Sequence, residues 1–67
     1  MDRMNAIRNK VREIGIGEER TFGYMTSIDH FSEDKRCFEK LHNDGEIELI
    51  YCQKVNYGTH VKLIRVK

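Results

Sequence analysis

The stretch FEKLHNDGEI, residues 38–47, decides the fold of this chain. Phe38 and Leu41 lie three residues apart, which is the spacing of an apolar stripe on an amphipathic helix. Gly45 is able to adopt the left-handed backbone conformation in which many helices end. Ile47 then begins an alternating pattern that is typical of a β-strand. The stretch therefore predicts a helix that turns directly into a strand.

The helix before Gly45 is predicted to run from about Glu33 to Asn43. Ser32 directly precedes it and can accept a hydrogen bond from a first-turn backbone N–H, as helix N-cap residues do. Glu33 and Asp34 follow in the first turn, where the helix dipole favours negative charge. These residues predict that Ser32 is the N-cap and that the helix begins directly after it.

A β-hairpin is predicted to follow the helix. Residues Ile47–Cys52 alternate between a more apolar and a less apolar face, as in a strand. Asn56–Gly58 is a turn, in which Gly58 suits the positive φ of a three-residue hairpin loop. Thr59–Val66 is then the returning strand.

The returning strand has an irregular apolar pattern. Val61 and Leu63 share one face, whereas Ile64 and Val66 share the other. Two explanations are open, since either a β-bulge re-phases this strand or both of its faces are partly covered.

An amphipathic helix is also predicted at the N-terminus, from about Asp2 to Ile14. Its apolar residues recur at spacings of three and four: Met4, Ile7, Val11 and Ile14. Gly15 and Gly17 follow at once and end it. Because the stripe is narrow, this helix is expected to cover a core on one side only.

The segment between the two helices has two interpretations. We expect a short extended piece around Arg20–Phe22, followed by one or two helical turns around Tyr24–His30. A continuous strand over Thr21–Ile28 is the alternative, because alternation and a three-residue period both fit so short a stretch.

The whole chain is expected to form one α+β domain, residues 1–67. Its 39% of hydrophobic residues is modest beside 34% of charged residues, but the hydrophobic residues fall in periodic groups. A disordered chain would not show such groups. No linker, repeat or low-complexity segment interrupts the pattern.

Two cysteines, Cys37 and Cys52, are too few for a disulfide framework, and we expect reduced, buried thiols. Residues Met1–Arg12 lack the apolar run of a secretory signal, and no run approaches the roughly 20 residues of a membrane span. The sequence therefore predicts a cytoplasmic protein that does not contact a membrane.

The charge is unevenly distributed along the chain. Residues 1–12 contain four cations and one acid, and residues 51–67 contain four cations and no acid. Residues 13–50 between them contain ten acids and four cations. Two basic ends therefore flank an acidic middle, a separation that suggests an electrostatically directional surface.

The segment Phe38-x-x-Leu41-x-x-x-Gly45-x-Ile47 resembles the end of the recognition helix and the start of the wing in winged helix-turn-helix domains. The order of the predicted elements resembles that family over nearly the whole chain. The resemblance implies a winged-helix-like fold: an N-terminal helix, a short strand or helix, a third helix and a C-terminal β-hairpin wing. The chain departs from the family at Asp34, where an apolar residue is usual.

The resemblance also implies a DNA-binding site. The third helix would lie in the major groove of double-stranded DNA and present Ser32, Lys35, Arg36 and Glu39. Arg36 would pair with guanine and Lys35 with phosphate, while Lys40 on the helix edge would reach the backbone. The wing would contribute Lys54, Asn56, Tyr57, His60 and Lys62.

The function expected from these features is that of a small DNA-binding protein. It would act as a transcriptional regulator or an accessory factor, of the phage or prophage kind because of its minimal size. It would be a monomer or a weak homodimer, and a dimer would use the first helix or the edge of the hairpin. The basic wing favours this interpretation more than the third helix, whose charged residues sum to −1.

Simpler interpretations stand beside it. The charged side of the third helix suits an ordinary solvated surface, and lysines on a hairpin also prevent sheet-to-sheet pairing. A protein-interaction module on the same fold is the alternative function, inhibiting or recruiting a host complex through its acidic middle or its hairpin edge.

Other functions are disfavoured by the sequence. The histidines and cysteines show no zinc-site spacing, so we expect neither a metal nor another cofactor. Gly15-Ile16-Gly17 lacks the third glycine of a nucleotide-binding loop. A domain of this size has little room for an enclosed pocket, so an enzyme is not expected.

Overall fold

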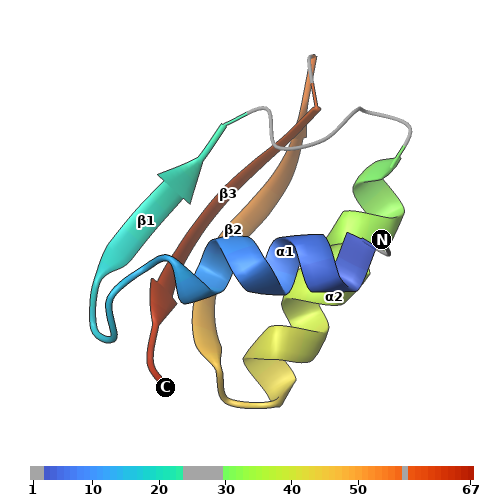
Figure 1. Ribbon diagram of the computed structural model, residues 1–67. Coiled ribbons are helices and arrows are strands. Elements are labelled where there is room, and N and C mark those ends of the chain that lie inside the picture. Colours follow the sequence, from blue (N-terminus) through green and yellow to red (C-terminus); the bar gives the residue numbers. More distant parts are fainter. Residues whose placement is uncertain (1–2, 24–29, 57) are drawn as a thin grey trace.

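The computed structural model describes residues 3–23, 30–56 and 58–67 (Figure 1). These residues form an α+β fold with two helices and a three-stranded antiparallel sheet, as the sequence predicted at this level. The elements in chain order are α1 (Arg3–Arg12), β1 (Glu19–Phe22), α2 (Phe31–Asn43), β2 (Ile47–Val55) and β3 (Gly58–Arg65). The extended piece predicted around Arg20–Phe22 is confirmed as β1, whereas the predictions for residues 24–29 lie outside the described residues.

Helix α2 begins earlier than predicted. It starts at Phe31, with His30 in the N-cap position and no side-chain capping bond, so the prediction of Ser32 as the N-cap is wrong. Phe31 is half-buried and lies three and seven residues before the buried residues Asp34 and Phe38. The buried stripe of the helix therefore begins at Phe31, and this burial replaces the missing cap.

The C-terminus of α2 confirms the role predicted for Gly45. Its φ is 79°, and its N–H donates to the carbonyl of His42 at 3.1 Å. The N–H of Glu46 donates to the carbonyl of Leu41 at 3.0 Å. These two bonds form a Schellman motif, which satisfies the last carbonyls of α2 and directs the chain into β2.

The sheet has the strand order β1-β3-β2, so the returning strand of the hairpin is central. Both helices pack on the same face of this sheet, and the hairpin tip and the C-terminus lie at its opposite ends (Figure 1). The core between the layers consists of Ile7, Val11, Ile14, Phe38, Leu41, Ile47, Val61 and Leu63. Its eight side chains come from α1, the turn after it, α2 and the two hairpin strands.

A β-bulge lies in β2, not in the returning strand. The register pairs Leu49 with Leu63 and then Tyr51 with Lys62, which leaves Ile50 as the extra residue. Leu49 and Cys52 consequently both face the helices, while Ile50 and Tyr51 face away from them. The alternation predicted for Ile47–Cys52 is therefore wrong beyond Leu49.

The returning strand β3 is regular. Its buried residues Thr59, Val61 and Leu63 alternate with half-buried residues on the other face, including Ile64. The register pairs Val55 with Gly58, so the loop between the strands holds two residues instead of the predicted three. Gly58 has a φ of 143°, which supports the prediction that this position needs glycine.

Candidate nucleic-acid interface

The predicted DNA-contacting residues of the hairpin lie on two different faces of the sheet. Lys54 pairs with the buried Thr59, so its side chain is on the face that the helices cover. His60 and Lys62 alternate with the buried residues of β3 and therefore lie on the opposite face. Asn56 is exposed at the tip, and Tyr57 lies outside the described residues. The hairpin therefore does not present its predicted residues as one surface.

Helix α2 presents its predicted residues to solvent. Asp34, Phe38 and Leu41 mark its buried side. The residues that the sequence assigned to the DNA groove, Ser32, Lys35, Arg36 and Glu39, are all exposed, as is Lys40, which it assigned to the DNA backbone. Lys40 lies 3.6 Å from Asp44 in an exposed i,i+4 ion pair, a pairing of small energetic value.

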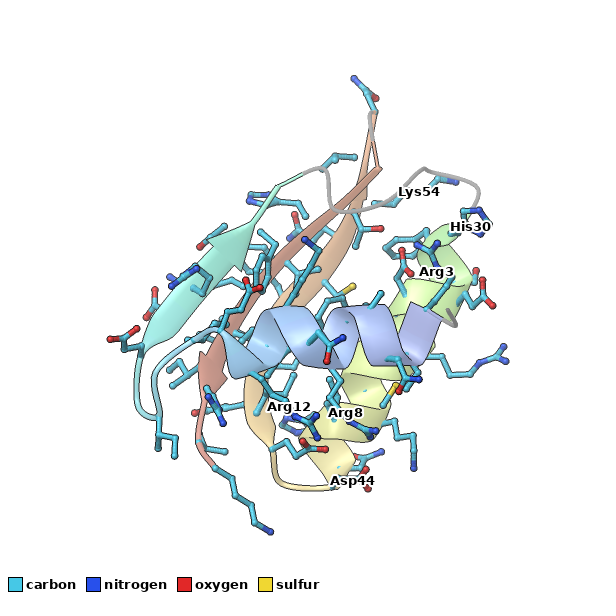
Figure 2. All side chains as sticks on the ribbon, in the orientation of Figure 1. Arg3, Arg8, Arg12, His30, Asp44 and Lys54 are labelled. Atoms are coloured by element: carbon cyan, nitrogen blue, oxygen red, sulfur yellow. The ribbon has the colours of Figure 1, made fainter. Side chains whose placement is uncertain are left out.

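Strand β2 packs against α2, so Lys54 lies on the sheet face that this helix covers. Cys52 is half-buried, and this burial raises the pKa of its thiol to about 11, while the nearby Lys35 acts in the opposite direction. Lys54 follows two residues later on the same face, and Figure 2 shows Lys54 and His30 toward the same end of the molecule. The raised pKa also keeps the Cys52 thiol protonated near neutral pH, where it is a poor nucleophile.

The exposed candidate residues of α2, β2 and the hairpin tip together define one candidate contact surface, here called the α2–hairpin surface. Its residues are Ser32, Lys35, Arg36, Glu39, Lys54 and Asn56, all of them exposed. Within the described ranges, no carboxylate forms an ion pair with Lys35, Arg36 or Lys54. The surface thus offers three cations against the single acid Glu39.

Lys62 is bound within the molecule. Its ammonium group lies 2.7 Å from a carboxylate oxygen of Glu19 on β1, and this hydrogen bond raises the pKa of Lys62. On the same face, the rings of Tyr51 and His60 meet edge to face with centroids 5.3 Å apart. The Tyr51 hydroxyl and Nε2 of His60 are 3.4 Å apart.

Arg65 also forms hydrogen bonds within the molecule, to the end of α1. Its guanidinium donates to the backbone carbonyls of Arg12 at 2.9 Å and Ile14 at 2.6 Å, and its Nε donates to the carbonyl of Lys67 at 3.1 Å. These contacts place a cation at the C-terminal end of α1, where the helix dipole is negative. The four cations of residues 51–67 therefore overstate the free positive charge of the hairpin.

Two arginines of α1 are paired with acids in α2 and the turn after it. Nε of Arg3 donates to the fully buried Asp34 at 2.7 Å, and this bond raises the pKa of Arg3. Arg8 lies 3.7 Å from Glu46. Sequence reasoning missed both pairs, although one signal was present: Asp34 is an acid within an apolar stripe.

The described residues form neither a metal-binding cluster nor a membrane-spanning helix. Across residues 3–23, 30–56 and 58–67, no three His, Cys, Asp or Glu side chains gather as a metal site requires. Neither described helix combines the length and apolarity of a transmembrane span.

Comparisons with protein-family models, with curated proteins and with solved structures gave no match to this chain.

Proposed function

We propose that this protein binds double-stranded DNA through the α2–hairpin surface, as a small winged-helix-like regulator or accessory factor of the phage or prophage kind. The observation that carries the proposal is that Lys35 and Arg36 on α2, and Lys54 on the sheet face that α2 covers, are exposed without an ion pair in the described residues. The order helix, strand, helix, hairpin supports it, because it is the order on which the family resemblance rests.

The contacts follow from the chemistry of the side chains. Lys35 on α2 and Lys54 on β2 suit phosphate oxygens, contacts that fix the position of a protein on the duplex. Arg36 and Glu39 lie on the solvent side of α2, where Arg36 suits guanine and Glu39 suits the amine of cytosine. Phosphate contacts by three cations imply a strong dependence on salt.

Titration of labelled duplex DNA at two salt concentrations tests the proposal. With about three phosphates neutralised, the logarithm of the binding constant should fall with a slope near −2.7, or roughly 40-fold between 50 and 200 mM salt. Lys54→Ala should reduce this slope by about 0.9 and weaken binding to all sequences alike. Arg36→Ala should instead change the preference among sequences.

Arg12→Ala is the matched control. It removes the same charge from an exposed side chain at the end of the molecule away from Lys54 and His30 (Figure 2). Lys62→Ala is a second control, because Lys62 lies on the other face of the same hairpin and is paired with Glu19. Absence of binding at low salt, or an equal loss with Arg12→Ala and Lys54→Ala, would refute the proposal.

The alternative is a protein-interaction module. One observation favours it: the helices leave one face of the sheet uncovered in the described part of the chain (Figure 1). Binding of a protein partner with no DNA affinity at low salt would be its signature.

A further inference from the structure

The sheet has an outer face that neither described helix covers. Side chains of all three strands form it: Glu19, Thr21, Glu48, Ile50, Tyr51, Gln53, His60, Lys62 and Ile64. Single-sided antiparallel sheets ordinarily present mostly polar residues on such a face. This face departs from that pattern in its middle, where β2 and β3 lie side by side.

An apolar strip runs across this outer face. The bulge turns Ile50 outward, and 45% of its surface is exposed. Ile64 lies diagonally across from it on β3, and the half-buried ring of Tyr51 lies next to it on β2. Val66 follows the last residue of β3, donates its N–H to the carbonyl of Glu46 at 3.2 Å and is 47% exposed. Of the three large apolar residues that the described chain exposes, Ile50 lies in this strip and Val66 lies just past the end of β3.

The charge beside the strip is neutralised within the face. Lys62 on the central strand is held 2.7 Å from Glu19. Glu48 is exposed on β2, which is an edge strand, so it can remain in water at the rim of a contact. The face consequently has no excess of positive charge for a nucleic acid, and its balance suits a surface that packs against its own copy.

The size of the face limits the strength of any contact that it makes. The eight residues of β3 extend about 27 Å, and three strands span about 14 Å. Two stacked faces of these dimensions have a combined area of only about 760 Å², which is below the roughly 1,200 Å² at which standard specific interfaces begin and corresponds to a weak contact. A weak dimer follows from that area.

We propose that the chain forms a homodimer in which two outer faces stack back to back. The sheets would lie about 10 Å apart, with the helices of each copy on the outside. This contact differs from the first helix and the hairpin edge that the sequence suggested for a dimer. The α2–hairpin surfaces of the two copies would face in opposite directions, so one dimer could hold two DNA segments.

Sedimentation velocity without DNA tests the dimer independently of the proposed function. The wild-type chain should shift from monomer to dimer as its concentration rises through the micromolar range. Ile50→Arg places a charge in the apolar strip and should weaken the dimer at least about 10-fold. Ile16→Arg is the matched control, because Ile16 is 68% exposed and lies in the turn before β1, outside the three strands.

Circular dichroism of both variants separates loss of the dimer from loss of the fold. Isotope-filtered NOEs between labelled and unlabelled wild-type copies need no variant and should connect Ile50 with outer-face residues of the other copy. A wild-type monomer at all concentrations overturns the dimer. A folded Ile50→Arg variant that dimerises normally would also overturn this dimer. Intermolecular NOEs confined to α1 or to the sheet edges would do the same.

Discussion

Replacing Arg3 with Ala should lower the free energy of unfolding by about 3 kcal/mol, because it leaves the buried carboxylate of Asp34 without its cation. Nε of Arg3 donates to Asp34 at 2.7 Å, and Asp34 has no exposed surface. The loss should be near the lower end for buried pairs, since about 30% of the Arg3 side chain is exposed. A chain this small has only about 3–10 kcal/mol of stability, so the variant should melt roughly 15 °C lower or fail to fold.

Lys10→Ala is the control for this experiment, because Lys10 is an exposed cation of the same helix. It should change the stability by less than about 0.5 kcal/mol. Asp34→Leu tests the other partner of the ion pair. It removes the buried acid and allows the Arg3 side chain to turn into water. It should cost less than Arg3→Ala. Equal melting temperatures for Arg3→Ala and Lys10→Ala would show that the pair does not stabilise the fold.

Arg65→Ala should destabilise the domain by about 2 kcal/mol, because it removes charged hydrogen bonds to the end of α1. The carbonyls of Arg12 and Ile14 would lose a donor at 2.9 Å and 2.6 Å. The Ile14 contact is the more important of the two, since it is partly buried and Ile14 itself belongs to the core. Unfolding in urea would measure the loss.

Hydrogen exchange gives a local test of the same contact. Amides in the last turn of α1 should exchange faster in Arg65→Ala than in the wild type, while those of α2 should change little. Arg65→Lys should recover part of the protection, because an ammonium group keeps the charge but not the fork of the guanidinium. Lys67→Ala, a neighbouring exposed cation, should behave as the wild type. Equal protection in both alanine variants would argue against a role for Arg65 at the helix end.

The parts of the fold that sequence predicted correctly are those that local chemistry determines. Gly45 ends α2 because a left-handed residue closes a Schellman motif, and that requirement is visible in FEKLHNDGEI. The start of α2 was misplaced because Phe31 is held by packing instead of by a capping side chain. The bulge at Ile50 was missed because the register of β2 depends on β3, not on β2 alone.

The candidate site was predicted in composition but not in arrangement. Lys62 and Arg65 were counted as free wing charges, yet their partners are Glu19 on β1 and the end of α1. Arg65 and Ile14 are 51 residues apart in the chain, a separation over which periodicity carries no information. The DNA-binding proposal therefore now depends on Lys35, Arg36 and Lys54, because His60 and Lys62 lie on the other face of the sheet.

The bulge in β2 makes this strand tolerant of a change in length at one position. Ile50 is the one residue of β2 without a pairing partner in β3. Deleting it would therefore leave Leu49 and Cys52 facing the helices and Tyr51 facing outward. Deleting a neighbour such as Cys52 would instead shift the remaining strand to the wrong face. Among natural or engineered variants of this chain, a one-residue gap in β2 should therefore occur at Ile50.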